Sequence, residues 1–201
     1  MSLKELDLKP VYYSDEVALL TEFYIPVLSN SIKYDRVAGF FCSNALAIAA
    51  KGISELFKKG GKVRLIANVV ISESDQKAIK QAIKDKEKKV LKELDEMEDE
   101  LQKDHVGMLG WLIRKGLLEI KIAVVKKGIE HQKIGILEDE EGNIISFSGS
   151  ENETVGGWLH NDEQFHVFCS WREGDITHLK PDIARFETLW NDEGKRVRVY
   201  D

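Results

Sequence analysis

Residues 130–152 read Glu-His-Gln-Lys-Ile-Gly-Ile-Leu-Glu-Asp-Glu-Glu-Gly-Asn-Ile-Ile-Ser-Phe-Ser-Gly-Ser-Glu-Asn. Alternating apolar and branched residues predict a strand over Glu130–Leu137 and a returning strand over Asn143–Phe147. The intervening residues 140–143, Glu-Glu-Gly-Asn, have the composition of a hairpin turn. Such a hairpin would place residues 149–152 beside the start of the first strand.

The first strand of this hairpin would carry two reactive side chains on one face. Side chains at positions i and i+2 of a strand point the same way, so His131 and Lys133 would stand side by side. Ile134 and Ile136 would then face the opposite side of the sheet. One face of the strand would therefore present the reactive side chains, and the other face would pack against the protein core.

Four further residues supply groups that suit phosphoryl transfer. Gly149 would permit a close backbone approach, while Ser150 and Asn152 would donate hydrogen bonds to phosphate oxygens. An imidazole can attack phosphorus or accept a proton near neutral pH, provided that its tautomer is fixed. Glu163, which opens a strand-like run, would accept the Nδ1 proton of His131 and leave Nε2 bare toward the substrate.

These residues resemble the motif of the phospholipase D superfamily, which is His-x-Lys, four residues, Asp, and then Gly-Ser-x-Asn. His131, Lys133 and residues 149–152 match, whereas Glu138 stands in place of the aspartate. Another His-x-Lys, at residues 178–180, has no Gly-Ser-x-Asn behind it, and we interpret it as a chance match. The resemblance implies a phospholipase D-like fold and a catalytic set of His131, Lys133, Ser150, Asn152 and Glu163.

The resemblance also implies a role for each member of that set. His131 would attack phosphorus and form a covalent phosphohistidine. Lys133, Ser150 and Asn152 would stabilise charge on the phosphoryl oxygens, and Glu163 would orient the histidine. The family aspartate is usually the most dispensable member, so the substitution at the fifth position after Lys133 affects structure more than catalysis.

Most of the chain is similar to the phospholipase D-like domain that precedes DEAD/DEAH-type helicases in prokaryotes. This resemblance implies that residues 1–201 are a single domain excised from a longer, helicase-containing chain. Residues 194–201 agree, because they stop abruptly on an apparent strand. The similar stretches are 34–41, 61–67, 131–142, 147–154, 157–158 and 165–171.

Composition narrows the class of protein further. A chain of 201 residues with 43% hydrophobic content can bury the core of one domain. We find no apolar stretch of about 20 residues and no signal-peptide core, so we expect a soluble, cytoplasmic protein without membrane contact. Cys42 and Cys169 lack metal-ligand spacing and are interpreted as buried free thiols. We expect neither a cofactor nor a metal ion.

Charge is distributed unevenly along the chain. The net charge is −6, and residues 85–104, with nine carboxylates and five lysines, contribute −4 of it. Apolar residues at helical spacing predict a long helix over 76–104, packed on its own domain or forming a short coiled coil between subunits. The remaining cations include candidates for a phosphate-binding groove: Arg36, Lys62, Arg64 and Arg114.

The order of elements predicts an α/β protein, a mixed sheet with helices on both faces. Helices are expected over Asp15–Ser31, Asn44–Lys58, Gly107–Lys115 and Asp182–Trp190 besides the charged helix. Strands are expected over Arg36–Cys42, Lys62–Val70, Leu117–Val125, Glu130–Leu137, Asn143–Phe147 and Glu163–Trp171.

The sequence favours a phosphodiesterase that is a metal-independent DNA endonuclease, with DNA preferred to RNA as partner. A homodimer is expected because the chain supplies one His-x-Lys motif where a complete superfamily site uses two. Residues 156–158, Gly-Gly-Trp, would pack around that interface. Two alternatives stay open: a degenerate module that binds nucleic acid or a partner without cutting, and a phospholipase, for which no basic interfacial helix is found.

Overall fold

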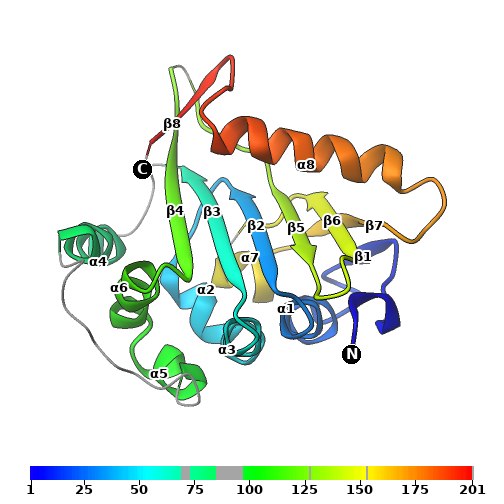
Figure 1. The fold of residues 1–201 in the computed structure, drawn as a ribbon, viewed down its shortest axis with the longest axis horizontal. Helices are drawn as coiled ribbons and strands as arrows, with labels where there is room; N and C mark the ends of the chain where they lie inside the picture. Colours follow the sequence, from blue (N-terminus) through cyan, green and yellow to red (C-terminus); the bar gives the residue numbers. More distant parts are fainter. Residues whose placement is uncertain (69–72, 85–96, 127, 153, 201) are drawn as a thin grey trace.

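The computed structural model describes residues 1–68, 73–84, 97–126, 128–152 and 154–200. Within these residues, eight strands form one sheet in the order β1-β7-β6-β5-β2-β3-β4-β8 (Figure 1). The strands are β1 (Val11–Tyr13), β2 (Lys33–Ala38), β3 (Lys62–Asn68), β4 (Leu118–Val125), β5 (Ile134–Glu138), β6 (Ile144–Gly149), β7 (Gln164–Cys169) and β8 (Val197–Tyr200).

The sheet is mixed, as the sequence predicts. Strands β2, β3 and β4 are parallel to one another. Every other adjacent pair of strands is antiparallel. The last residues of β2, β3, β4 and β6 therefore lie at one end of the sheet, which we call the carboxyl end. Strands β5, β7 and β8 run the other way and begin at this same end.

Helices cover one face of the sheet over the larger core. Their apolar residues pack on strand residues such as Leu65, Phe147 and Phe165, all of which are buried. Helix α4 (Glu73–Lys84) lies against α6. The other helices that contribute to this core are α1 (Ile25–Ser29), α2 (Ser43–Ile48), α3 (Ala50–Lys58), α5 (Met97–Lys103), α6 (His105–Arg114) and α7 (Val155–Leu159).

A single long helix, α8 (Ile176–Trp190), covers the opposite face (Figure 1). Phe186 and Leu189 pack there against Val37, Ile66 and Ile136. Each fully buried side chain of this size contributes about 1.5–3 kcal/mol to stability. The predicted architecture, a mixed sheet with helices on both faces, is confirmed.

Several predicted elements differ in length from the observed ones. The helix expected over Asp15–Ser31 is a π-helical segment, Leu20–Tyr24, followed by α1. Helix α8 begins at Ile176, six residues before the predicted start, and contains Pro181. Strand β1 and helix α7 were not predicted, because elements of three and five residues are too short for periodicity to reveal them.

The expected charged helix over 76–104 is described only at its two ends. Helices α4 and α5 occupy those ends, and residues 85–96 lie outside the described part of the chain. Met97 and Leu101 of α5 are buried in the larger core. This packing favours the first of the two alternatives, a helix that packs on its own domain.

No helix in the described residues is long and apolar enough to cross a membrane. Both cysteines are free thiols, as predicted. Cys169 is fully buried, and burial raises the pKa of its thiol to about 11. Cys42 is only half-buried, because it lies between β2 and α2 at the rim of the core.

Candidate active site

The predicted reactive residues meet at the carboxyl end of the sheet. In the ladder of β2, β5 and β6, Val37 is paired with Ile134, which is paired with Ser148. The last residue of β6, Gly149, is paired with Phe165 of β7. The segments that leave or enter these strands at this end are therefore neighbours, although more than a hundred residues of sequence separate β2 from β7.

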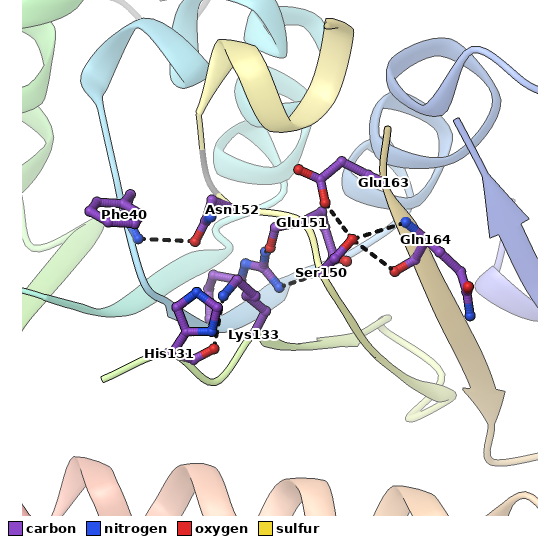
Figure 2. A network of polar contacts seen from close by, with 9 residues as sticks. Phe40, His131, Lys133, Ser150, Glu151, Asn152, Glu163 and Gln164 are labelled. Atoms are coloured by element: carbon purple, nitrogen blue, oxygen red, sulfur yellow. Dashed lines mark hydrogen bonds and ion pairs between the residues drawn. The ribbon is translucent and has the colours of Figure 1, made fainter. Parts of the chain in front are cut away.

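His131 and Lys133 precede β5 rather than lying within it, since the strand begins at Ile134. The predicted strand over Glu130–Leu137 was thus set too early, and the two side chains are not arranged as neighbours on a strand. Instead the Lys133 ammonium folds back and donates a hydrogen bond of 2.8 Å to the His131 carbonyl (Figure 2). The prediction for Ile134 and Ile136 is confirmed, because both pack on the α8 face.

His131 and Lys133 differ sharply in exposure. The imidazole of His131 is exposed, whereas Lys133 is only 4% exposed. Burial, and then the positive charge of Arg36, lower the pKa of Lys133 below its ordinary value. The carboxylates of Glu151, Glu163 and Glu130 act in the opposite direction. The site therefore holds a poorly hydrated cation, which an anionic ligand would stabilise.

Asn152 is fixed from the β2 side of the site. Its side-chain carbonyl accepts a hydrogen bond of 3.1 Å from the backbone N–H of Phe40, just after β2 (Figure 2). A Cβ atom placed on Gly39 would lie 3.1 Å from Asn152 Oδ1 and 3.6 Å from Lys133 Nζ. Glycine at position 39 thus lets the amide and the ammonium approach each other.

Ser150 and Glu163 form a second contact of the site. The Ser150 hydroxyl donates a very short hydrogen bond to Glu163, which also accepts one of 3.0 Å from the side-chain amide of Asn161. An open pocket of about 510 Å³ adjoins this pair and is lined in addition by Tyr13, Asp15, Gly149, Asp162 and Gln164. Glu163 is nearly buried, so these contacts define where its carboxylate points.

The structure does not bring Glu163 to His131. In Figure 2, His131 lies at the lower left and Glu163 at the upper right, with Lys133 and Ser150 between them. Among the described residues, none forms a hydrogen bond with the His131 ring. The carboxylate that was expected to orient the histidine is occupied by Ser150 and Asn161 instead.

The close backbone approach predicted at Gly149 is confirmed, and the backbone that approaches is that of β7. A Cβ atom there would lie 2.0 Å from the carbonyl oxygen of Gln164 and 2.6 Å from Phe165 Cα. Any side chain would therefore push β6 away from β7 and displace Ser150, which follows directly. The Gly-Ser pair positions the hydroxyl through close packing of two strands.

A buried ion pair beneath the site was missed by sequence reasoning. Arg36 and Glu151 are both fully buried, with Nη1 and Oε1 3.2 Å apart, and Nη2 donates a bond of 2.8 Å to the Glu151 carbonyl. The guanidinium also lies over the Phe147 ring, 5.0 Å from its centroid. Burial raises the pKa of Glu151 to about 7, although Arg36 acts in the opposite direction.

This pair anchors the Gly-Ser-x-Asn turn from inside the protein, because Arg36 grips the backbone between Ser150 and Asn152. Its signal in the sequence was a charged residue, Arg36, at the start of the apolar stretch that follows it. The phosphate-binding groove predicted from Arg36, Lys62, Arg64 and Arg114 is wrong for two of these residues. Arg36 is buried, and Arg64 is bound to Asp35 and Glu187 near α8.

Comparison with known proteins identifies the fold. No protein-family model and no curated protein sequence matches the chain. Two solved structures match over nearly their whole lengths, each with a TM-score of 0.50. NucT from Helicobacter pylori is 16% identical, with 88% of this chain and 94% of that chain covered. Nuc, a phospholipase D family member from Salmonella typhimurium, is 14% identical, with 94% and 95% covered.

This is the phospholipase D-like fold. The predicted fold class is therefore confirmed by topology and by these similar structures. At such low identity the likeness establishes the fold alone. Roles of individual residues rest on the geometry described above.

Glu138, which stands where the motif has an aspartate, lies at the end of a strand. Glu138 ends β5, and its carbonyl accepts a hydrogen bond from the N–H of Ile32. The next residue, Asp139, is buried and accepts bonds from the backbone of Leu3, Glu141 and Asn143. These bonds lower the pKa of Asp139, against the effect of burial. The carboxylate that holds the β5–β6 turn thus stands one residue later.

Proposed function

We propose that the chain is a phospholipase D-like phosphodiesterase that cuts nucleic acid, with DNA preferred to RNA. The observation that carries this proposal is the meeting of His131, Lys133, Ser150 and Asn152 at one end of the sheet. An exposed imidazole lies there beside a buried ammonium, an amide and a hydroxyl. This combination provides a nucleophile and hydrogen-bond donors for a phosphoryl group.

The reaction begins with attack by the His131 imidazole on phosphorus. A nitrogen–phosphorus bond forms, the bond to the leaving oxygen breaks, and the alkoxide takes a proton from a general acid. Water then loses a proton to that same group, attacks phosphorus and breaks the nitrogen–phosphorus bond. Lys133 stabilises the negative charge of the phosphoryl oxygens in both steps, and its burial makes the interaction stronger than in bulk water.

Glu163 is proposed to act in this reaction as an orienting residue. Its observed partner is the Ser150 hydroxyl, so it supports that hydroxyl in the unliganded protein. Reaching the His131 ring requires a change of side-chain conformation when substrate binds. A Glu163→Gln variant that loses activity but keeps its stability would support the role, whereas an equally active variant would remove it.

The general acid is proposed to come from a second copy of the chain. Each chain supplies one exposed histidine in this motif, and a two-fold axis would bring His131 of the partner subunit opposite the first. Ile129, two residues before His131, is 51% exposed and provides apolar surface for such a contact. Of residues 156–158, which were expected near this interface, Trp158 is buried in its own chain and stacks on Tyr24.

Mixing active and His131→Ala chains tests this composite site. If each site needs two copies of His131, activity falls as the square of the fraction of active chains. A linear fall means that each chain works alone. Light scattering gives the oligomeric state, and a strict monomer that cuts DNA would overturn the dimer.

The primary experiment is to incubate the protein with end-labelled single- and double-stranded DNA and RNA in EDTA. The described residues contain no group of three or more His, Cys, Asp or Glu side chains arranged to hold a metal ion, and Lys133 is assigned the electrostatic role. Cleavage in EDTA, with acid-labile phosphate trapped on His131, is expected. Cleavage that requires added Mg²⁺ would contradict the mechanism.

Binding without cleavage is the alternative function. The specific observation that favours it is the engagement of Glu163 by Ser150 and Asn161, which leaves the histidine ring without that carboxylate. DNA binding with no product and no label on His131 would support this alternative.

We also propose that residues 1–201 are one domain of a longer chain that contains a helicase. The support is the sequence resemblance of residues 34–41 and 61–67 to helicase-linked domains. The full-length coding sequence tests this directly: absence of a helicase domain would overturn it.

A further inference from the structure

A basic groove lies away from the site residues, along strands β4 and β8. It has a volume of about 670 Å³ and is lined by Val124, Val125, Lys126, Lys195, Arg196, Arg198 and Tyr200. We call it the β8 groove. All four charged residues that line it are cations, although the chain as a whole carries a net charge of −6.

Three of these cations are available for a ligand. Lys126, Lys195 and Arg196 are exposed and form no hydrogen bond or ion pair with any residue that the structure describes. Arg198 differs, since its guanidinium is held by Asp192. Elsewhere the arginines Arg36 and Arg64 are neutralised by carboxylates. The β8 groove therefore presents three unpaired cations to solvent.

The groove reaches the carboxyl end of the sheet, where the proposed active site lies. Strand β4 ends at Val125, and β8, which is antiparallel to it, begins at Val197. Strands β2 and β3 separate β4 from β5, so Lys121, which is level with Ile134 in the sheet register, lies about 14 Å from the start of β5 at a strand spacing of about 4.8 Å. Lys126 lies five residues further along the chain, about 16 Å beyond that level at a rise of about 3.3 Å per residue, so a strand of several nucleotides would span the two sites. In Figure 1 the connection from β4 to β5 crosses this end of the sheet.

Apolar and aromatic surface adjoins the cations. Val197 and Val199 face α8 and are buried, so the alternate residues Arg196, Arg198 and Tyr200 lie on the other face of β8. Tyr200 is 55% exposed and Val124 is 38% exposed. An exposed tyrosine beside a row of cations is the arrangement on which proteins stack the bases of single-stranded nucleic acid.

We propose that the β8 groove binds the phosphates and a base of a single nucleic-acid strand that continues from the proposed active site. The inference rests on the proposed function for the site itself. Lys126, Lys195 and Arg196 contact phosphates, while Tyr200 stacks on a base. A site of this kind would hold a long substrate at a distance from the bond that is cut.

Binding and cleavage are tested separately. The probe for binding is a labelled 20-nucleotide single-stranded DNA, measured by fluorescence anisotropy at several salt concentrations. Lys126→Ala/Lys195→Ala/Arg196→Ala should weaken binding about tenfold or more at ~0.1 M salt and reduce the salt slope by about 2. The control, Lys51→Ala/Lys58→Ala/Lys59→Ala, removes equal charge from exposed positions on α3 and directly after it.

Tyr200 gives an independent readout. Tyr200→Ala should weaken DNA binding about tenfold, whereas Tyr200→Phe keeps the ring and should bind like the parent protein. Polyglutamate of matched charge is measured alongside, because it carries anions without bases. Equally tight binding of polyglutamate would assign the groove to an acidic protein and overturn the proposal.

A small chromogenic phosphodiester separates this groove from the active site. The triple variant should hydrolyse that substrate at the parental rate, while its KM for the DNA strand rises. Failure of the parent protein to cut either substrate would defeat the proposed function, and the anisotropy measurements would still decide the groove. Unchanged affinity and salt slope in the triple variant, or no DNA binding by the parent protein, would overturn the inference.

Discussion

Two His-x-Lys triplets in this chain have opposite surroundings. Residues 131–133 precede β5 at the carboxyl end of the sheet, beside Asn152 and above the buried pair of Arg36 and Glu151. Residues 178–180 lie in α8, where the His178 ring stacks on Phe168 with centroids 4.5 Å apart. The same spacing thus accompanies a cluster of polar groups in one place and surface packing in the other.

The comparison shows that the backbone conformation decides whether two side chains at this spacing can contact one ligand. Side chains two residues apart on a helix point in widely different directions, since a helix turns about 100° per residue. His178 and Lys180 therefore cannot address one ligand atom. Lys133, by contrast, is buried where three strand ends meet, and other parts of the chain supply the groups around it.

Replacing the two histidines breaks the comparison most directly. His131→Ala should reduce turnover of DNA by at least about a thousandfold, because it removes the nucleophile. His178→Ala should remain within about twofold of the parent protein, as expected for a surface substitution. Initial rates on one labelled substrate measure both, and equal rates for the two variants would refute the assignment.

The next largest effect concerns what lies beneath the first triplet. Arg36→Met should lower the free energy of unfolding by about 3–5 kcal/mol, because it leaves the buried Glu151 without its partner. Urea denaturation at pH 8 measures this. Arg64→Met is the matched control on the opposite face of the sheet. It should cost less, since Lys33 lies 3.1 Å from Asp35 and remains as a partner.

The two lysines extend the comparison to transition-state stabilisation. Lys133→Met and Asn152→Ala should each reduce kcat by about 10²–10³-fold, or about 2.7–4 kcal/mol, as found for lost oxyanion donors. Lys180→Met should leave kcat unchanged. Single-turnover measurements at saturating substrate separate these effects from binding. Parental kcat in the Lys133 variant would contradict the role of the ammonium.

The pH dependence of stability sharpens the contrast between buried and exposed surroundings. The pKa of Glu151 in the folded protein is raised to about 7 from an ordinary value of 4.5. The contribution of protonated Glu151 to the free energy of unfolding is therefore fully present below about pH 4.5 and is lost as the pH rises through 7. Glu151→Gln cannot ionise.

The stability of Glu151→Gln relative to the parent protein should thus increase from pH 5 to pH 8, measured by urea denaturation. Glu138→Gln, on the half-buried end of β5, is the control. Parallel stability profiles for the parent protein and the Glu151 variant would show that the carboxyl group does not change its ionisation there.

The smallest expected effect lies just beyond the first triplet. Glu138→Ala should change stability by less than about 0.5 kcal/mol and leave turnover near the parental value. Asp139→Ala should cost about 1–3 kcal/mol, because several backbone N–H groups lose their acceptor. Thermal and urea unfolding compare the two. A larger loss in the Glu138 variant would mean that the position of the family aspartate has kept its function.

Sequence reasoning located the site residues but not their contacts. His131, Lys133, Ser150 and Asn152 were selected by residue type, by spacing and by resemblance to the phospholipase D motif, and the hairpin between them was predicted with its turn. The hydrogen bonds from Phe40 to Asn152 and from Lys133 to the His131 carbonyl were beyond reach. They depend on how β2 and β5 are aligned, which a local pattern does not encode.

Within the fold, long and periodic segments were predicted better than short ones. Strands β3 and β4 were expected close to their observed bounds, because both are rich in branched apolar residues over seven or eight positions. Strand β1 and α7 were missed, since each gains its stability from neighbours that are distant in sequence. Val11 pairs with His166, and Trp158 of α7 stacks on Tyr24.

The sequence by itself determined the fold class and the hairpin, because these follow from local periodicity and turn composition, and its motif selected the candidate reactive residues. Only the tertiary structure decided that Glu163 contacts Ser150, that Arg36 and Glu151 are buried together and that the free cations line β8. The physical reason is that a side chain's partners and hydration depend on strand order and burial. Those are properties of the folded chain as a whole.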